Sequence, residues 1–290
     1  MLIKTFYNKD TSTFTHVVVD EDTHQCAVID SVLDYDHFSG KVKTDSADQV
    51  IAYIKENNLS NQWILETHIH ADHITASTYL KEHIGGKTAI SVHIKDVLKI
   101  WVALFDTSED TPITGEQFDR LLDEGDTLKI GNLTLTTWLT PGHTPACASY
   151  YCPQHNVIFV GDTMFAPTIG TARCDFPGGS AANLYKTIQR FYTLPNETKI
   201  YLCHDYPAEG EEPLVSITIG EQKNQNAQCR PATQCAEYIH KRETRDATLA
   251  VPKLLFPSIQ TNLRLGDFGV KSANGLQYIK IPINALDDEI

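Results

Sequence analysis

The chain has 290 residues, of which 41% are hydrophobic, so it carries enough apolar material to bury a substantial core. This composition excludes a disordered or fibrous protein. The formal net charge of -13 disfavours binding to nucleic acid or to an anionic membrane surface, so an anionic substrate would need a local basic group.

The first elements predicted are a hairpin, a helix and a buried strand. Residues 14–19 are rich in β-branched side chains, and residues 25–29 follow an acidic turn. Apolar residues recur at helical spacing after Ser46, which we expect to cap a helix that ends near Asn57. The apolar run 63–65 predicts a buried strand, and a cluster of histidines begins where this run ends.

Helices and strands are then predicted to alternate. A helix is expected before Gly85, and the dipeptide Gly131-Asn132 is typical of a two-residue hairpin. Alternation of this kind predicts sheets covered by helices. The segments concerned are strands at 89–92, 127–130, 133–139, 148–151, 157–160 and 199–202, and a helix at 181–191.

The character of the sequence changes beyond Pro213. Residues 222–245 are polar and partly helical in pattern, and residues 252–282 are predicted to be rich in loops, with apolar side chains that pack back. We therefore expect a catalytic domain over 1–212 and a C-terminal extension over 213–290 packed on the same domain. No secretory signal or membrane span is evident, which favours a cytoplasmic protein that does not bind membranes. The seven scattered cysteines fit reduced thiols.

The histidine cluster has the composition of a metal site. His68, His70, Asp72 and His73 fall within six positions. In an extended segment alternate residues point the same way, so His68 and His70 can face one point while the other two arrive from the following turn. A lone histidine is usually structural, but so many polar groups would lack partners if they were buried without a ligand.

Two later segments extend this pattern. His143 lies in the rigid turn Thr140-Pro141-Gly142-His143-Thr144-Pro145, and Asp162 follows an apolar strand and Gly161. The motifs occur in the order HxHxDH, PGHT, GD and then Cys203-His204-Asp205-Tyr206. This order resembles that of the metallo-β-lactamase superfamily and is highly specific for it.

A narrower resemblance covers nearly the whole chain. The segments 66–73, 170–179 (GTARCDFPGG), 204–206 (HDY) and 255–262 (LFPSIQTN) look like those of the persulfide dioxygenases, and in particular the bacterial branch labelled β-lactamase-like hydrolase. The resemblance implies an α/β metallo-β-lactamase fold, which is a four-layer αββα sandwich with a C-terminal extension.

The resemblance also implies one Fe(II) per chain, bound by His68, His143 and Asp162. Two imidazoles and one carboxylate leave several iron positions open. The family reaction converts glutathione persulfide, O2 and water to glutathione and sulfite in sulfide detoxification, and the family is often homodimeric. Other polar residues of the motifs are implied to surround the ligands without binding iron: His70, Asp72, His73, His204 and Asp175.

Arg173 and Tyr206 match family residues that line the substrate pocket. Arg173 is the best candidate cation for a glutathione carboxylate, because guanidinium binds carboxylates in a bidentate way. The alternative for Arg173 is a structural ion pair with Asp175, and the alternative for Tyr206 is packing. Cys174 is expected to be a plain buried thiol rather than a group that reacts with persulfide.

Three other functions remain open. A glyoxalase II-like thiolester hydrolase would use all seven candidate ligands to hold two metal ions and activate water. A β-lactamase would require export, which nothing in the sequence suggests. A partner module could bind persulfide without turnover, although the complete ligand triad argues against it.

Overall fold

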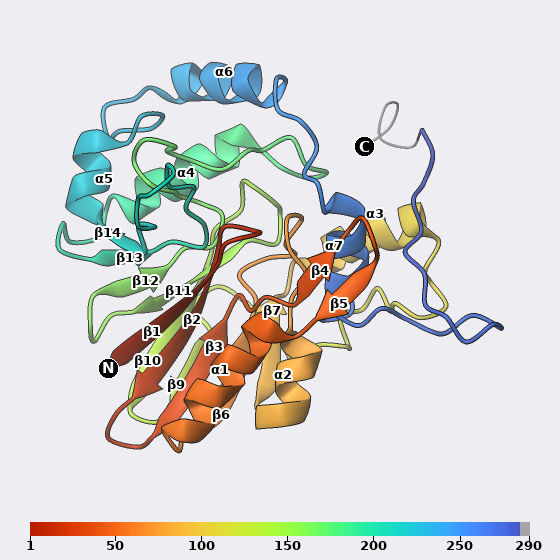
Figure 1. Cartoon of the computed structure of the whole chain (residues 1–290). Helices are drawn as coiled ribbons and strands as arrows, with labels where there is room; N and C mark the ends of the chain where they lie inside the picture. The colour runs from red at the N-terminus through yellow and green to blue at the C-terminus, as the bar shows by residue number, and fades with distance from the viewer. Residues whose placement is uncertain (285–290) are drawn as a thin grey trace.

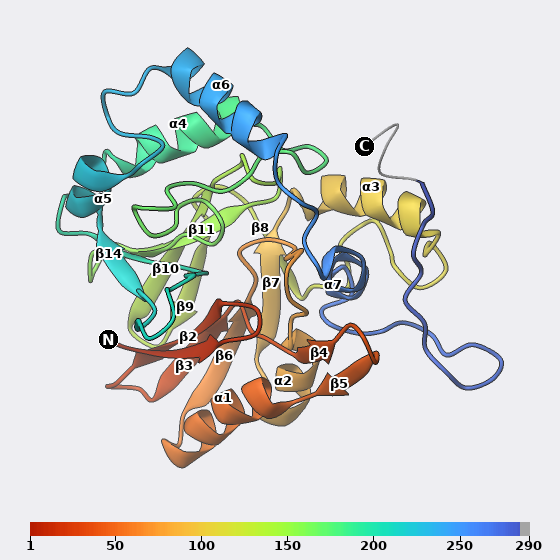
Figure 2. The same cartoon turned by 45° about the horizontal axis from the view of Figure 1, so that its top comes forward.

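The structure is a computed structural model that describes residues 1–284. It contains two six-stranded sheets packed face to face, and Figures 1 and 2 show helices on the outer side of each. The first sheet has the order β1-β2-β3-β6-β7-β8. Its strands are β1 (Leu2–Asn8), β2 (Thr13–Asp20), β3 (Gln25–Ile29), β6 (Ser60–Leu65), β7 (Lys87–Ser91) and β8 (Arg120–Leu122).

The second sheet has the order β14-β13-β12-β11-β10-β9, and a separate hairpin pairs β4 with β5. Neighbouring strands of the second sheet are antiparallel except for β12 and β13, which run parallel. The strands are β4 (Asp34–Asp36), β5 (Lys41–Lys43), β9 (Thr127–Ile130), β10 (Leu133–Leu139), β11 (Ala148–Cys152), β12 (Val157–Phe159), β13 (Lys199–Tyr201) and β14 (Ser216–Thr218).

Strand β2 shows why the layers form. All its residues are buried, as expected of a strand covered on both faces. Successive side chains point to opposite faces, so Val17 and Val19 pack with the helix α1 (Asp45–Glu56) and Val18 packs with the second sheet. The predicted αββα sandwich is confirmed. The other helices are α2 (Ser77–Ile84), α3 (Ile94–Phe105), α4 (Ala181–Phe191), α5 (Ile219–Gln225), α6 (Cys235–Asp246) and α7 (Leu255–Asn262).

The C-terminal helices pack on the sandwich. Tyr238 of α6 shares a core cluster with Leu184 of α4, and Ile259 of α7 shares one with Leu98 of α3 and Ile69 of the histidine motif. The division of the chain at residue 212 stays a prediction, and positions 285–290 of the predicted extension lie outside the described residues. Among residues 1–284, no helix is both long and apolar enough to cross a membrane.

Some local predictions were wrong. The first helix begins at Asp45, and the Ser46 hydroxyl donates to Asp34 Oδ1 at 2.7 Å instead of capping the helix. The tail contains α7, whose apolar side chains pack on α3, so tertiary contacts stabilise a helix where the sequence predicted loops. The hairpin across Gly131-Asn132 and the helix 181–191 are confirmed.

We expect Leu184→Ala to lower the free energy of unfolding by about 3 kcal/mol, because it leaves a cavity between α4 and the second sheet. Leu184 is fully buried there, whereas Lys186 on the same helix is exposed. Urea unfolding of Leu184→Ala beside the control Lys186→Ala measures the difference. Equal stability of the two variants would contradict this packing.

Candidate metal centre

Strand ends of both sheets deliver the histidine and aspartate side chains of the motifs. The motif loop, residues 66–76, follows β6 of the first sheet and carries His68, His70, Asp72 and His73. His143 follows β10, Asp162 follows β12 and His204 follows β13, all from the second sheet. These seven side chains therefore meet at one edge of the sandwich, where both sheets contribute residues.

The first group consists of His68, His143 and Asp162. One ligand atom from each lies within 4.8 Å of the others; His68 and His143 are buried, and the Asp162 side chain is 12% exposed. Asp162 Oδ2 is 4.0 Å from His68 Nε2 and 3.9 Å from His143 Nε2, which is too far for hydrogen bonds. His68 Nε2 is buried without any hydrogen-bond partner, so a cation between these atoms would satisfy it. The group therefore fits a metal ion.

Hydrogen bonds on the far side of each imidazole leave the Nε2 lone pairs free. His143 Nδ1 donates to the Arg173 carbonyl oxygen at 2.7 Å. The Thr67 hydroxyl donates to Asp30 Oδ2, so it accepts from His68 Nδ1 at 3.0 Å. Burial lowers the pKa of His68 well below its ordinary value, which keeps the imidazole neutral. Such partners orient ligands and select the tautomer that binds metal.

The turn that carries His143 lies directly against α4. Gly142 has φ of +154°, and a Cβ at this position would lie 2.5 Å from Leu184 Cα. Only glycine permits this approach, because any side chain would meet the helix backbone. Helix α4 thus fixes the position of the turn that carries His143.

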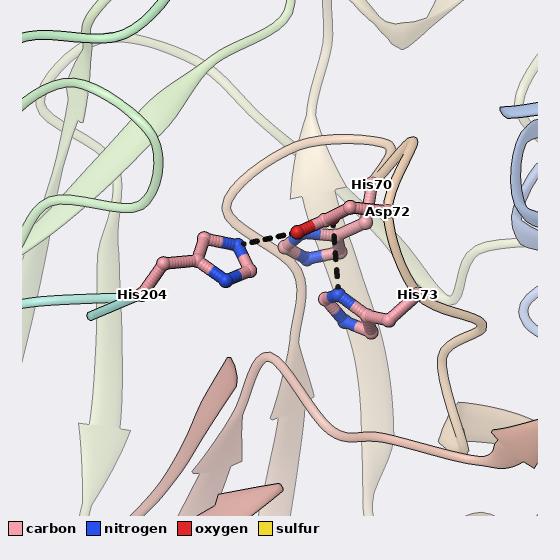
Figure 3. A group of neighbouring side chains, drawn as sticks. All are labelled: His70, Asp72, His73 and His204. Atoms are coloured by element: carbon pink, nitrogen blue, oxygen red, sulfur yellow. Dashed lines mark hydrogen bonds and ion pairs between the residues drawn. The ribbon is translucent and has the colours of Figure 1, made fainter. Parts of the chain in front are cut away.

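The second group consists of His70, Asp72, His73 and His204. Figure 3 shows that His204 approaches Asp72 from the side of the second sheet. Asp72 Oδ2 is 3.2 Å from His204 Nε2, and Asp72 Oδ1 is 3.3 Å from His73 Nδ1. Burial and the charge of His70 lower the pKa of His73 to about 4. His73 Nε2 is buried without a hydrogen-bond partner. These atoms also fit a cation, and His70, whose Nδ1 is buried without a hydrogen-bond partner, belongs to the same group.

His70 lies between two buried carboxylates. Its Nε2 is 3.1 Å from Asp30 Oδ1 and 3.3 Å from Glu66 Oε2. Burial alone would lower the pKa of His70, but the two carboxylates outweigh it and raise that pKa well above its ordinary value. Its ring lies 4.2 Å from that of His68, yet Nε2 points to the carboxylates and does not join the group of His68 and His143.

Sequence reasoning missed Asp30, Glu66 and the role of Asn262. Asp30 directly follows β3, and an acidic residue after a buried apolar strand was the available signal. Asn262 of α7 donates to the carbonyl oxygens of His70 and His73 at 2.9 and 2.8 Å and accepts from the Thr75 amide. The C-terminal helix therefore holds the motif loop in shape, which no local pattern reveals.

The metal-binding edge opens into a cavity of about 470 Å³. Tyr206 lines it, is 54% exposed, and its ring is nearly parallel to that of His204. Desolvation and the Asp72 charge raise the pKa of Tyr206, so its hydroxyl stays protonated at neutral pH. The remaining lining residues are Ala71, Asp72, His143, Asp162, Phe165, Ile169, Thr171, Ala172, Arg173, Phe176, Arg245, Leu249 and Pro252.

Arg173 lines this cavity, but its guanidinium already has partners. It donates to both carboxylate oxygens of Asp175 at 2.6 Å, and Nη1 donates to the Ala250 carbonyl oxygen at 2.8 Å. The ion pair that the sequence left open as an alternative is therefore formed. Asp175 contacts Arg173 and makes no hydrogen bond to a candidate ligand side chain within residues 1–284. Cys174 is buried, and burial raises the pKa of its thiol.

A buried ion pair in α6 holds the segment that orients His143. Arg242 is 2% exposed, and its Nε and Nη2 donate to Asp246 Oδ1 at 2.9 and 2.6 Å. Its Nη1 donates to the Thr171 carbonyl oxygen, and Asp246 Oδ2 accepts from the Cys174 amide. These bonds flank Arg173, whose carbonyl oxygen accepts from His143.

The chain belongs to the metallo-β-lactamase superfamily, whose family model matches residues 10–204. It is 45% identical to Glyoxylase B2 of Dictyostelium discoideum over 98% of this chain and 97% of that protein. It is 26% identical to persulfide dioxygenase ETHE1 of Homo sapiens, over 92% and 89% of the two chains. The crystal structure of ETHE1 from Myxococcus xanthus superposes with a TM-score of 0.73 at 28% identity. The superposition covers 92% of this chain and 100% of that chain.

We expect His143→Ala to weaken the binding of a divalent ion by more than about 10-fold, because it removes an imidazole of the first group. Titration with Co(II) followed by its visible absorption measures the affinity. His240→Ala is the matched control, since His240 is exposed on α6 and lines no part of the cavity. Unchanged affinity in His143→Ala would remove His143 from the site.

We expect Asp246→Ala to lower the free energy of unfolding by about 3–5 kcal/mol, because it leaves the Arg242 guanidinium buried without its anion. The double variant Arg242→Met with Asp246→Leu should lose less than the single variant, since it buries no unpaired charge. Chemical unfolding of all variants tests this. A double variant less stable than Asp246→Ala would contradict the prediction.

Proposed function

We propose that this chain is a persulfide dioxygenase that oxidises the outer sulfur of glutathione persulfide to sulfite with O2. The group His68, His143 and Asp162 carries the proposal, because two imidazoles and one carboxylate form the facial set typical of non-haem Fe(II) oxygenases. An Fe(II) ion in this group would supply open coordination positions for the persulfide sulfur and O2. The likeness to persulfide dioxygenase ETHE1 supports the same reaction.

The overall reaction balances as glutathione persulfide plus O2 plus water giving glutathione plus sulfurous acid, which ionises to sulfite. The persulfide group loses four electrons in total, O2 accepts them, and the sulfur–sulfur bond breaks. The thiol proton and the two protons of water are shared between glutathione and the sulfurous acid. The homodimer and the role in sulfide detoxification that the resemblance implies belong to the same proposal.

The side chains of the cavity have separate tasks in this proposal. Phe165 and Phe176 provide apolar walls that exclude water from the sulfur. The protonated Tyr206 hydroxyl donates a hydrogen bond to the substrate beside the ligands. His68 Nδ1 donates to the Thr67 hydroxyl and His143 Nδ1 donates to the Arg173 carbonyl oxygen, and these hydrogen bonds keep both ligand Nε2 atoms directed inward.

A second candidate function is hydrolysis of a glutathione thiolester by two metal ions. The observation that favours it is the second group, in which His73 Nε2 is buried without a partner and Asp72 lies within reach. The 45% identity to Glyoxylase B2 of Dictyostelium discoideum points the same way. Against it, His70 Nε2 is held by Asp30 and Glu66, which leaves the first group with two imidazoles.

For the dioxygenase we expect one iron per chain and equimolar O2 uptake and sulfite release from glutathione persulfide, both lost in His143→Ala. Metal analysis, an oxygen electrode and sulfite assay on one purified sample measure these quantities. The same sample is offered a glutathione thiolester under nitrogen as the control reaction. Two metal ions per chain with thiolester hydrolysis and no O2 uptake would reject the dioxygenase in favour of the hydrolase.

A further inference from the structure

We propose that Arg245, at the end of α6, is the residue that binds a carboxylate of the glutathione moiety and so sets substrate specificity. The inference rests on the proposed function for the identity of the substrate, and it holds equally for a glutathione thiolester. Glutathione carries two carboxylates, and the chain has a net charge of -13, so recognition requires a cation fixed in the cavity wall.

Only two arginines, and no lysine, line the cavity among the described residues. The family resemblance indicates Arg173 as the cation that binds the substrate carboxylate. However, Arg173 Nε and Nη2 already donate hydrogen bonds to Asp175, and Nη1 donates to the Ala250 carbonyl oxygen. The hydrogen bonds to Asp175 and the charge of Asp175 raise the pKa of Arg173, so the two side chains satisfy each other. A substrate carboxylate would have to displace Asp175 to use the same edge of the guanidinium.

Arg245 has the properties that Arg173 lacks. Within residues 1–284 its guanidinium forms no ion pair within 4.0 Å, and it makes no hydrogen bond to another side chain or carbonyl. Its side chain is exposed, while its neighbour Asp246 is buried in the pair with Arg242. The buried pair therefore fixes the helix end, and the next position presents a free bidentate donor to the cavity.

The cavity that Arg245 lines is the one that contains the candidate ligands His143 and Asp162. Leu249 and Pro252 continue its wall from the segment that leaves α6, and in Figure 2 this segment descends from α6 to α7. One cavity thus combines metal-binding groups for sulfur, apolar walls for the chain of the tripeptide and an unpaired guanidinium for a carboxylate.

The test compares Arg245→Gln with Lys241→Gln, which removes the same charge from the same helix but lies outside the cavity lining. Calorimetry of the metal-loaded protein with S-methylglutathione, which lacks the outer sulfur of the persulfide, measures binding without turnover. Sulfite assays measure kcat and KM for glutathione persulfide and for a persulfide without carboxylates. Arg245→Lys tests rescue by a second cation.

We expect Arg245→Gln to raise the S-methylglutathione Kd and the glutathione persulfide KM by about 10-fold with kcat little changed, because a bidentate charged contact is lost. Lys241→Gln and the persulfide without carboxylates should show no such change, and Arg245→Lys should recover part of the binding. If the wild type fails to bind S-methylglutathione, or if Lys241→Gln weakens binding as much as Arg245→Gln, the proposal is overturned.

The two proposals can fail separately. Sulfite production by a protein whose Kd and KM do not depend on Arg245 overturns the role of Arg245 and leaves the dioxygenase standing. Binding of S-methylglutathione that depends on Arg245, without O2 uptake or sulfite, supports the role of Arg245 and rejects the dioxygenase.

Discussion

The carboxylate of Asp30 is the constraint on which the rest of the site depends. It is 2% exposed and lies just after β3, with a left-handed φ of 52°. It accepts from the amide and hydroxyl of Thr67 and pairs with His70, and these interactions outweigh the cost of burial and lower its pKa. A buried anion is stable only when such partners surround it. The bonds to Asp30 fix the position of Thr67, and the Thr67 hydroxyl in turn fixes the position and the tautomer of His68.

This arrangement divides the histidine motif between two tasks. His68 turns toward His143 and Asp162, while His70 turns to Asp30 and Glu66. The motif loop contains no helix or extended strand of its own, and Asn262 of α7 donates hydrogen bonds to its carbonyl oxygens. The C-terminal helices thus contribute to the site itself: α7 supports the motif loop, and α6 holds the segment that orients His143.

Much of the fold was predictable because its signals are local. The strand at 25–29 and the helix at 181–191 have the predicted bounds, since apolar periodicity reports directly on which face is buried. The helix α7 was not predicted, because its buried face is defined by contacts with α3 far away in the chain. The start of the first helix was also not predictable from the local pattern, because the Ser46 hydroxyl donates to Asp34 of β4 instead of capping the helix.

The chemical inventory of the site could be read from the amino-acid sequence: the histidines and aspartates, their order along the chain, and their positions after apolar strands. The partners of these side chains depend on how the chain folds in three dimensions. The fold joined Arg173 to Asp175, left Arg245 facing the same cavity, and placed His70 between two carboxylates. The reason is physical: residue type sets which bonds a side chain can make, whereas burial and the approach of distant segments decide which of those bonds form.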